Sequence, residues 1–183
     1  MNNKPAVLAG NNKHSEIKIV DYHPAHQPYF EAFNRVWIEE LFEMEPVDEW
    51  VLTHPEQALL QTGGAILIAE YNSVPAGTVG LRKVDNETWE FTKMAVDKNY
   101  RRLGIAEAIS YASFKKAKEL GAKKVILYSN TKNAGAIKLY EKIGFQHVEV
   151  EQGVYKRANV KMTIDIHIAI AAAKKFDELM LET

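Results

Sequence analysis

The residues best suited to chemistry lie within residues 94–120, where an apolar strand end runs through a basic turn into a helix. The turn carries Lys98, Arg101 and Arg102, and Gly104 stands where the helix begins. The start of a helix leaves backbone N–H groups unpaired and carries the positive end of the helix dipole. Cationic side chains that lead into such a helix therefore indicate a binding site for a phosphorylated ligand.

An ordinary strand-to-helix connection with solvated basic residues would explain the charges alone, so the spacing matters more. The spacing is Arg101-x-x-Gly104-x-Ala106. A glycine lets the backbone come close to a ligand, and the small alanine two positions later keeps the next contact short. One glycine stands where the dinucleotide pattern G-x-G-x-x-G needs two or three, so that fold is not indicated. We call residues 101–106 the cradle.

The spacing of the cradle resembles the acetyl-CoA binding motif of the GNAT superfamily of N-acetyltransferases, (Q/R)-x-x-G-x-(G/A). Downstream, Asn130 and Asn133 precede the run L-Y-E-K-I-G-F at 139–145, which is similar to the family's asparagine-bearing loop and L-Y-x-x-x-G-F helix end. Two motifs in the right order are more specific than either alone. The resemblance covers residues 87–145 and implies transfer of an acetyl group from acetyl-CoA to a primary amine of a small molecule or peptide.

The resemblance also implies how the coenzyme is held. Backbone groups of the strand that feeds the cradle would pair with the pantetheine arm, as an added strand pairs with a sheet edge, where this strand and the next splay apart. Arg102 departs from the pattern, because the family often has glycine there. Asn133 is alternatively an N-cap of the following helix, and it can do both. The residues assigned to acetyl-CoA are Met94, Ala95, Val96, Arg101, Arg102, Leu103, Gly104, Ile105, Ala106, Asn130, Asn133 and Ala136.

Glu90 is the candidate general base. An alkyl ammonium has a pKa near 10.4, so deprotonating it at neutral pH costs roughly 4 kcal/mol and a base helps. Many family members carry a glutamate in this strand. Strict alternation predicts one shared face for Glu90, Thr92, Met94 and Val96, toward the side of the coenzyme. The alternative is a surface or edge glutamate without a chemical role.

Tyr140 is the candidate general acid. The resemblance places at this position a tyrosine that protonates the departing CoA thiolate, and a phenol can do so within hydrogen-bond reach. Its alternative role is packing, because Ala136, Ile137, Tyr140 and Ile143 recur at helical spacing.

Two further polar groups have open interpretations. The acidic segment 39–49 is either a solvated helix end and loop or an attractor of a cationic amine. Tyr155, Arg157 and Asn159 are predicted as residues of an exposed turn, although an arginine there could orient a substrate carboxylate. The six histidines form no i, i+4 pair with a carboxylate partner, so no metal site is predicted.

Composition narrows the class of protein. A chain of 183 residues that is 46% apolar suits one globular domain. The net charge of −1 argues against a nucleic-acid partner. The absence of cysteine excludes disulfides and a thiolate nucleophile, so any acyl transfer proceeds directly or through another nucleophile, and direct attack of the amine is the expected route. No run approaches a signal peptide or a membrane span, so we expect a soluble, cytoplasmic protein with no membrane partner.

Hydrophobic periodicity predicts an α+β fold with a mixed central sheet flanked by helices, and the family resemblance implies that it is a single GNAT-like domain. We expect an N-terminal arm at 1–15, the acetyltransferase domain at 16–166 and a C-terminal helix extension at 167–183. That helix packs either on its own domain or on a second copy, as in a homodimer. The predicted strands span 16–20, 65–71, 78–84, 88–96, 125–128, 145–150 and 160–166, and the helices 29–42, 54–61, 105–120, 134–143 and 168–180.

A function of another class fits the same cradle. An acyl-CoA-binding regulatory or sensor domain would keep the phosphate site without turnover. The presence of both Glu90 and Tyr140 favours the enzyme, since a binding domain needs neither a base nor an acid.

Overall fold

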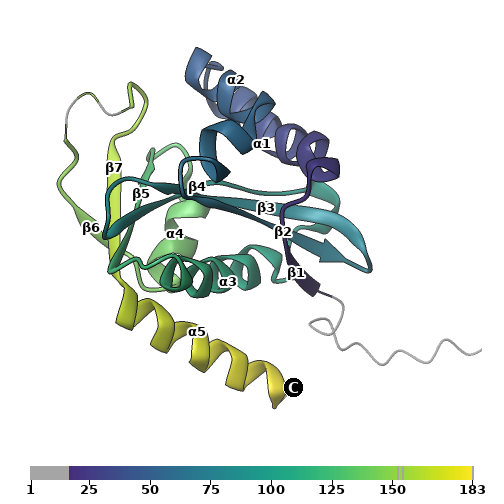
Figure 1. Cartoon of the computed structure of the whole chain (residues 1–183), viewed down its shortest axis with the longest axis vertical. Coiled ribbons are helices and arrows are strands. Elements are labelled where there is room, and N and C mark those ends of the chain that lie inside the picture. Colours follow the sequence, from purple (N-terminus) through teal and green to yellow (C-terminus); the bar gives the residue numbers. More distant parts are fainter. Residues whose placement is uncertain (1–16, 152, 154, 183) are drawn as a thin grey trace, which may run out of the picture.

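One mixed sheet of seven strands organises the chain in the order β1-β2-β3-β4-β5-β7-β6 (Figure 1). The computed structural model describes residues 17–151, 153 and 155–182, so the predicted arm at 1–15 lies outside the described residues. Strands β4 and β5 run parallel and the other neighbours antiparallel. The strands are β1 (Ile17–Asp21), β2 (Ala65–Tyr71), β3 (Val74–Lys83), β4 (Thr88–Val96), β5 (Lys124–Ser129), β6 (Gln146–Val148) and β7 (Val160–Asp165).

Helices cover both faces of this sheet (Figure 1). On one face lie α1 (Gln27–Leu41) and α2 (Pro46–Thr53), and on the other α3 (Ile105–Glu119), α4 (Ala134–Lys142) and α5 (Ile166–Leu181). Short helical turns span Pro24–His26, Glu56–Leu60 and Lys98–Tyr100, the second of them π-helical. The architecture confirms the predicted mixed sheet flanked by helices.

Strand β2 shows why its sequence is apolar without alternation. Ile66 and Ile68 pack in the core beneath α1 and α2, whereas Leu67 and Ala69 pack in the core on the side of α3. A strand covered on both faces needs apolar side chains at successive positions. The predicted span of β2 is therefore confirmed at both ends.

The hairpin from β2 to β3 is tighter than predicted. Asn72 and Ser73 both have positive φ, at 50° and 65°, and this conformation closes a hairpin in two residues. Val74 already pairs with Tyr71, so β3 begins at Val74 and not at residue 78. The prediction was wrong because Pro75 and Gly77 resemble turn residues, although Pro75 lies at an irregularity in the pairing where a strand tolerates proline.

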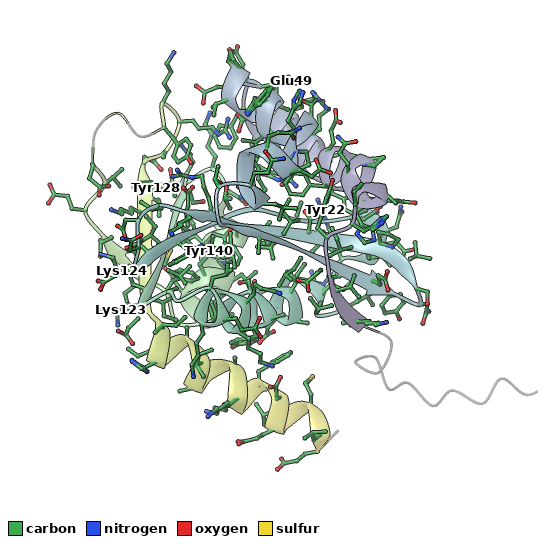
Figure 2. The ribbon with its side chains drawn as sticks, in the orientation of Figure 1. Tyr22, Glu49, Lys123, Lys124, Tyr128 and Tyr140 are labelled. Carbon is green, nitrogen blue, oxygen red and sulfur yellow. The ribbon has the colours of Figure 1, made fainter. Side chains whose placement is uncertain are left out.

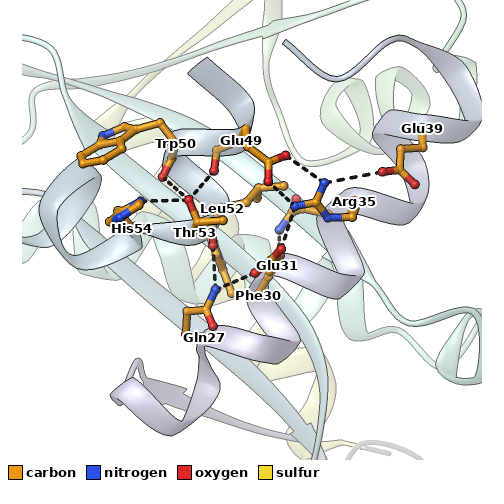
Figure 3. Close-up of polar contacts among 11 residues, drawn as sticks. Gln27, Phe30, Glu31, Arg35, Glu39, Glu49, Trp50, Leu52, Thr53 and His54 are labelled. Carbon is orange, nitrogen blue, oxygen red and sulfur yellow. Dashed lines mark hydrogen bonds and ion pairs between the residues drawn. The ribbon is translucent and has the colours of Figure 1, made fainter. Parts of the chain in front are cut away.

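The acidic segment 39–49 does not end as a loop, because α2 begins at Pro46. Pro46 occupies the first turn, and Asp48 Oδ2 accepts a hydrogen bond from the Glu45 backbone N–H at 3.3 Å. Proline and acidic residues in a first turn are typical of a helix start, and this signal was missed. Arg35 of α1 then holds α2 in place, since its guanidinium donates to both carboxylate oxygens of Glu49 at 2.9 Å (Figure 3).

The C-terminal helix α5 packs against its own domain. It follows β7 directly, with the Asp165 side chain accepting from the His167 N–H at 2.8 Å. The Phe176 ring stacks on Tyr111 of α3 at a centroid distance of 4.6 Å. The division into a domain ending at 166 and an extension stays a prediction. Across the described stretch of the chain, no helix has the length and apolarity needed to cross a membrane.

Candidate active site

The site forms where two neighbouring strands diverge. Strands β4 and β5 pair only through Thr88, Trp89 and Glu90, opposite Lys124, Val125 and Ile126. From Phe91 onward, the side of β4 that faces β5 has no strand partner in the described structure. Its backbone groups there remain able to pair with an extended ligand. The splay expected from the family resemblance is thus present.

The cradle lies at the end of β4 and at the start of α3. Gly104 precedes the helix with φ of +83°, which glycine adopts without strain. Arg102, where the family often has glycine, also has positive φ, at +61°. An arginine in this conformation costs roughly 1 kcal/mol relative to glycine. The loop therefore keeps its shape despite the departure from the motif and gains a second guanidinium beside Arg101.

An open groove with a cavity volume of about 620 Å³ runs from the cradle along β4. This volume lies within the roughly 300–1,000 Å³ of typical small-ligand pockets. The groove passes between β4 and α4, with α1 at its upper wall. The residues that line the groove include Trp37, Met94, Val96, Arg101, Arg102, Ala106, Asn133 and Ala136.

The other residues assigned to the coenzyme lie differently. Ile105 is fully buried in the core and Leu103 packs against that core, so neither side chain presents itself mainly to a ligand. The Asn130 side chain donates to the Arg157 carbonyl and accepts from the Lys132 N–H at 2.9 Å. Asn133 occupies the N-cap position of α4, as the alternative predicted, but its side chain makes no capping hydrogen bond to that helix.

A second cavity, which we call the tyrosine pocket, joins this groove. Trp37, Met94 and Asn133 line both cavities, so the two meet at these side chains. Tyr128 of β5 and Tyr140 of α4 both line this cavity, and both side chains are labelled in Figure 2. The residues that define the tyrosine pocket are Glu90, Tyr128, Tyr140, Tyr155 and Arg157.

Glu90 is a buried carboxylate with its partners already in place. It is 2% exposed and lies opposite Arg82 on β3, whose Nε donates to Oε2 at 2.9 Å. The Tyr155 hydroxyl donates to the same carboxylate, at 2.9 Å from Oε1 and 3.1 Å from Oε2. The alternative of a surface or edge glutamate is therefore wrong.

The strict alternation expected for β4 is also wrong. Gly80 pairs with Thr92 and Thr78 with Ala95, so β4 carries one extra residue between these pairs. Lys93 occupies this bulge with φ of +51°. A bulge changes which side chains share a face, and bulges are frequent beside active sites. As a result Lys93 and Met94 both line the tyrosine pocket.

A buried hydrogen-bond chain supports the bulge from the side of α1. Asn34 and Thr78 are 0% exposed, and Asn34 Nδ2 donates to Thr78 Oγ1 at 3.1 Å. The Thr78 hydroxyl in turn donates to the Lys93 carbonyl at 3.1 Å, and Trp37 Nε1 donates to Asn34 Oδ1. These hydrogen bonds were not predicted from the sequence, although Asn34, a polar residue on the apolar face of α1, could have indicated them.

Tyr140 both packs in the core and lines the tyrosine pocket. Its ring contacts Phe91 and Phe145 edge-on at centroid distances of 5.7 and 6.1 Å, which confirms a packing contribution. The same side chain lines the tyrosine pocket. Burial raises the pKa of the Tyr140 phenol above its ordinary value, so the hydroxyl is protonated at neutral pH.

Asp48 anchors the opposite wall of the pocket. Its side chain is 3% exposed and accepts from Lys93 Nζ at 3.0 Å and from both terminal nitrogens of Arg157, one at 2.9 Å. Burial alone would raise the pKa of Asp48, but the hydrogen bonds from Arg157 and the charge of Lys93 outweigh it and lower this pKa to about 2. Asp48 is thus neither solvated nor free to attract an amine.

The segment before β7 is not a simple exposed turn, as had been predicted. Tyr155 and Arg157 reach Glu90 and Asp48, which lie 65 and 109 positions away in the sequence. Asn159 is exposed and bonds to Thr131. Among the described residues, no group of three or more metal-binding side chains is placed to hold an ion.

Comparison with known proteins places this geometry in a family. The family model described as "Acetyltransferase (GNAT) family" matches residues 22–145. An N-alpha-acetyltransferase of Sulfurisphaera tokodaii is 44% identical over 63 residues, which are 34% of this chain and 38% of that protein. The uncharacterized N-acetyltransferase YjgM of Escherichia coli is 28% identical over 100 residues, 53% of this chain and 60% of that protein. The chain therefore spans less than two thirds of the length of these relatives.

Solved structures share the fold. A GNAT-family acetyltransferase of Staphylococcus aureus superposes with a TM-score of 0.72 at 24% identity, covering 82% of this chain and 99% of that one. A spermidine N-acetyltransferase of Vibrio cholerae, in complex with CoA and spermine, gives a TM-score of 0.65 at 16% identity, with 86% and 99% covered. Because the family model matches more than half of the sequence, the chain belongs to the GNAT acetyltransferase family.

Proposed function

We propose that this chain is an acetyl-CoA-dependent N-acetyltransferase that acts on a primary amine of a small molecule or peptide. The observation that carries the proposal is the continuity of two cavities. The groove leads from the cradle, where Arg101 and Arg102 meet the start of α3, to a pocket that holds Glu90 and Tyr140. A phosphate site, an open strand edge and paired acid–base groups are the parts that such a reaction needs.

The donor groups fit coenzyme A by their chemistry. Guanidinium groups of Arg101 and Arg102 suit the diphosphate, since arginine binds planar or clustered oxygens well. The open edge of β4 at Met94–Val96 suits the amides of the pantetheine arm. Bound there, acetyl-CoA supplies the acetyl group as a thioester. Asn133 and Ala136 line the groove beside this path.

Glu90 and Tyr140 divide the proton transfers. The amine must lose a proton as it attacks, and we assign Glu90 as the base that takes it. The departing sulfur must gain one, and we assign the Tyr140 hydroxyl as the donor. Burial disfavours phenolate and thiolate alike, so the raised pKa of Tyr140 does not by itself prevent transfer to a sulfur in the same pocket.

A cationic acceptor suits the entrance. A further cavity shares two lining residues, Phe42 and Arg157, with the tyrosine pocket. Most of the other residues that line this further cavity are acidic. An acidic surface raises the local concentration of a cationic amine. The acidic residues that line it are Glu39, Glu40, Glu43 and Glu45.

The direct test is release of free thiol from acetyl-CoA in the presence of a panel of amines and N-terminal peptides, with a thermal shift by CoA measured in parallel. We expect turnover with at least one amine and stabilisation by CoA. Stabilisation without turnover on any amine would instead support an acyl-CoA-binding regulatory domain. Neither binding nor turnover would reject both functions.

Replacing Arg101 with alanine should weaken CoA binding by about tenfold. A charge-assisted hydrogen bond to phosphate contributes roughly 1.5–3 kcal/mol, and about 1.4 kcal/mol corresponds to tenfold in Kd. The wild type should also lose affinity as salt is raised, and the variant less so. Isothermal titration calorimetry at two salt concentrations measures both effects.

Lys115→Ala is the matched control, because Lys115 lies on α3 away from the cradle and pairs with Asp177. Its CoA affinity should equal that of the wild type. If Arg101→Ala binds CoA as tightly as Lys115→Ala, the diphosphate does not lie at the cradle.

A further inference from the structure

Tyr155 is the least expected member of the tyrosine pocket. It comes from the segment between β6 and β7, outside both blocks that resemble the family motifs, and its ring meets Tyr128 edge-on at 5.3 Å. Its hydroxyl lies within hydrogen-bond distance of both oxygens of Glu90. The candidate base is thus in direct contact with a second titratable group that lines the same cavity.

The polarity of this contact limits what the phenol offers to a ligand. The Glu90 carboxylate accepts from the guanidinium of Arg82 and from the Tyr155 hydroxyl, so Tyr155 is the donor in its contact with Glu90. Its proton is thereby committed, and its oxygen also lies within hydrogen-bond reach of the Arg82 guanidinium, so the phenol oxygen retains one lone pair for the pocket. Burial and the negative charge of Glu90 raise the pKa of Tyr155, so the group stays a neutral phenol at working pH.

This inference rests on the proposed function. We propose that Tyr155 is a catalytic residue whose phenol oxygen accepts a hydrogen bond from an N–H of the acceptor amine and relays the amine's proton to Glu90. As the amine nitrogen forms its bond to the acyl carbon, the π electron pair of the C=O bond moves onto the carbonyl oxygen. The N–H bond breaks and its proton moves to the phenol oxygen. The phenolic proton moves at the same time to the Glu90 carboxylate. Collapse of this tetrahedral adduct then breaks the C–S bond, and the departing sulfur takes its proton from Tyr140. Tyr155 is neutral before and after, Glu90 carries the proton, and Glu90 returns it to solvent in a later step.

Two features of the surroundings suit this role. Arg82 holds Glu90 from the side of β3, at 2.9 Å from Nε, so the carboxylate cannot turn away from Tyr155. The ring of Tyr155 is fixed by Tyr128, which sets the direction of the phenol oxygen. An oxygen that only accepts selects acceptors with an N–H, so primary amines should react and tertiary amines should neither react nor compete strongly.

The test is Tyr155→Phe, which keeps the ring and removes the relay. We expect kcat to fall by about 100-fold, the low end of the range for acid–base catalysis, with an unchanged KM for acetyl-CoA. The matched control is Tyr22→Phe. Tyr22 donates to Glu56 Oε1 at 2.8 Å, the same type of bond, but lies apart from Tyr128 and Tyr140 in the molecule (Figure 2). The control should keep the wild-type kcat.

A double variant tests whether Tyr155 acts through Glu90. If Tyr155 acts through Glu90, then Glu90→Gln together with Tyr155→Phe should lower kcat about as much as Glu90→Gln alone. If the losses in kcat of the two single variants multiplied in the double variant, that result would overturn the relay. So would a raised KM for the amine with kcat retained, because that result assigns Tyr155 to positioning.

A second variant tests the relay without removing the hydrogen bond to Glu90. If Tyr155→Phe does not fold, Tyr155→3-fluorotyrosine keeps the hydrogen bond and makes the phenol oxygen less basic, and the relay predicts a lower kcat at constant melting temperature. An unchanged kcat in that variant would overturn the proposal. A wild type that binds CoA but acetylates no amine would overturn both the relay and the proposed function, whereas an active Tyr155→Phe would overturn the relay alone.

Discussion

Replacing Tyr140 with phenylalanine should lower kcat by about 100- to 1,000-fold while the protein stays folded. A general acid contributes typically 10²–10⁴-fold, and the departing sulfur would have to take its proton from water instead. The ring contacts with Phe91 and Phe145 persist in the variant because they do not involve the hydroxyl. Steady-state kinetics with acetyl-CoA, together with a thermal melt, measure the two expectations.

A role in packing alone makes the opposite prediction for this variant. In that case Tyr140→Phe would be folded and fully active, and the acid would have to be another group. Tyr111→Phe provides the comparison, because Tyr111 also has a pKa raised by burial and stacks on an aromatic ring, but it lies on α3 outside the tyrosine pocket. Its kcat should match that of the wild type.

Replacing Asp48 with alanine should lower the free energy of unfolding by about 3–5 kcal/mol. Removing one partner of a buried ion pair leaves the other charge desolvated and uncompensated. Here Lys93 loses its carboxylate partner, and Arg157 keeps only the longer contact with Glu45, at 3.6 Å. Urea denaturation followed by circular dichroism measures the loss. Asp177→Ala breaks the exposed pair with Lys115 and should cost under about 1 kcal/mol.

The lowered pKa of Asp48 predicts that the stability of the protein depends on pH. The pKa of Asp48 is lowered to about 2 in the folded protein from an ordinary 3.8, so the folded state holds its proton less tightly than the unfolded chain. The stabilisation is therefore complete above pH 3.8 and is lost as the pH falls toward 2. The difference in stability between wild type and Asp48→Ala should shrink over that interval. A constant difference would mean that Asp48 does not carry the stabilising charge.

Local patterns predicted the parts of the fold that depend on neighbouring residues. The bounds of β2 and β4 were predicted as observed, since continuous apolar runs bounded by turn residues mark strands well. The cradle was predictable because a basic turn, a glycine and a helix start follow one another within a few positions. The placement of Tyr140 in the pocket also followed from a motif at one helix end.

Contacts between distant segments could not be predicted in the same way. Nothing near Asp48 in the sequence shows that Arg157 will neutralise it, and the acidic segment therefore resembled a solvated surface. The bulge at Lys93 depends on Thr78 of the neighbouring strand and on Asn34 of α1. Tyr155 resembled a loop residue because its partner, Glu90, lies in another part of the chain.

The groove and the tyrosine pocket share Trp37, Met94 and Asn133, but Arg101, Arg102 and Ala106 line only the groove, whereas Tyr155, Arg157 and Ala158 line only the pocket. Substitutions in α2 or in the segment before β7 can reshape the pocket without touching the cradle. Under the proposed function, divergent evolution can exchange one acceptor preference for another while the cradle stays unchanged. Laboratory selection for new acceptors should concentrate its mutations on those two segments and spare the three shared side chains.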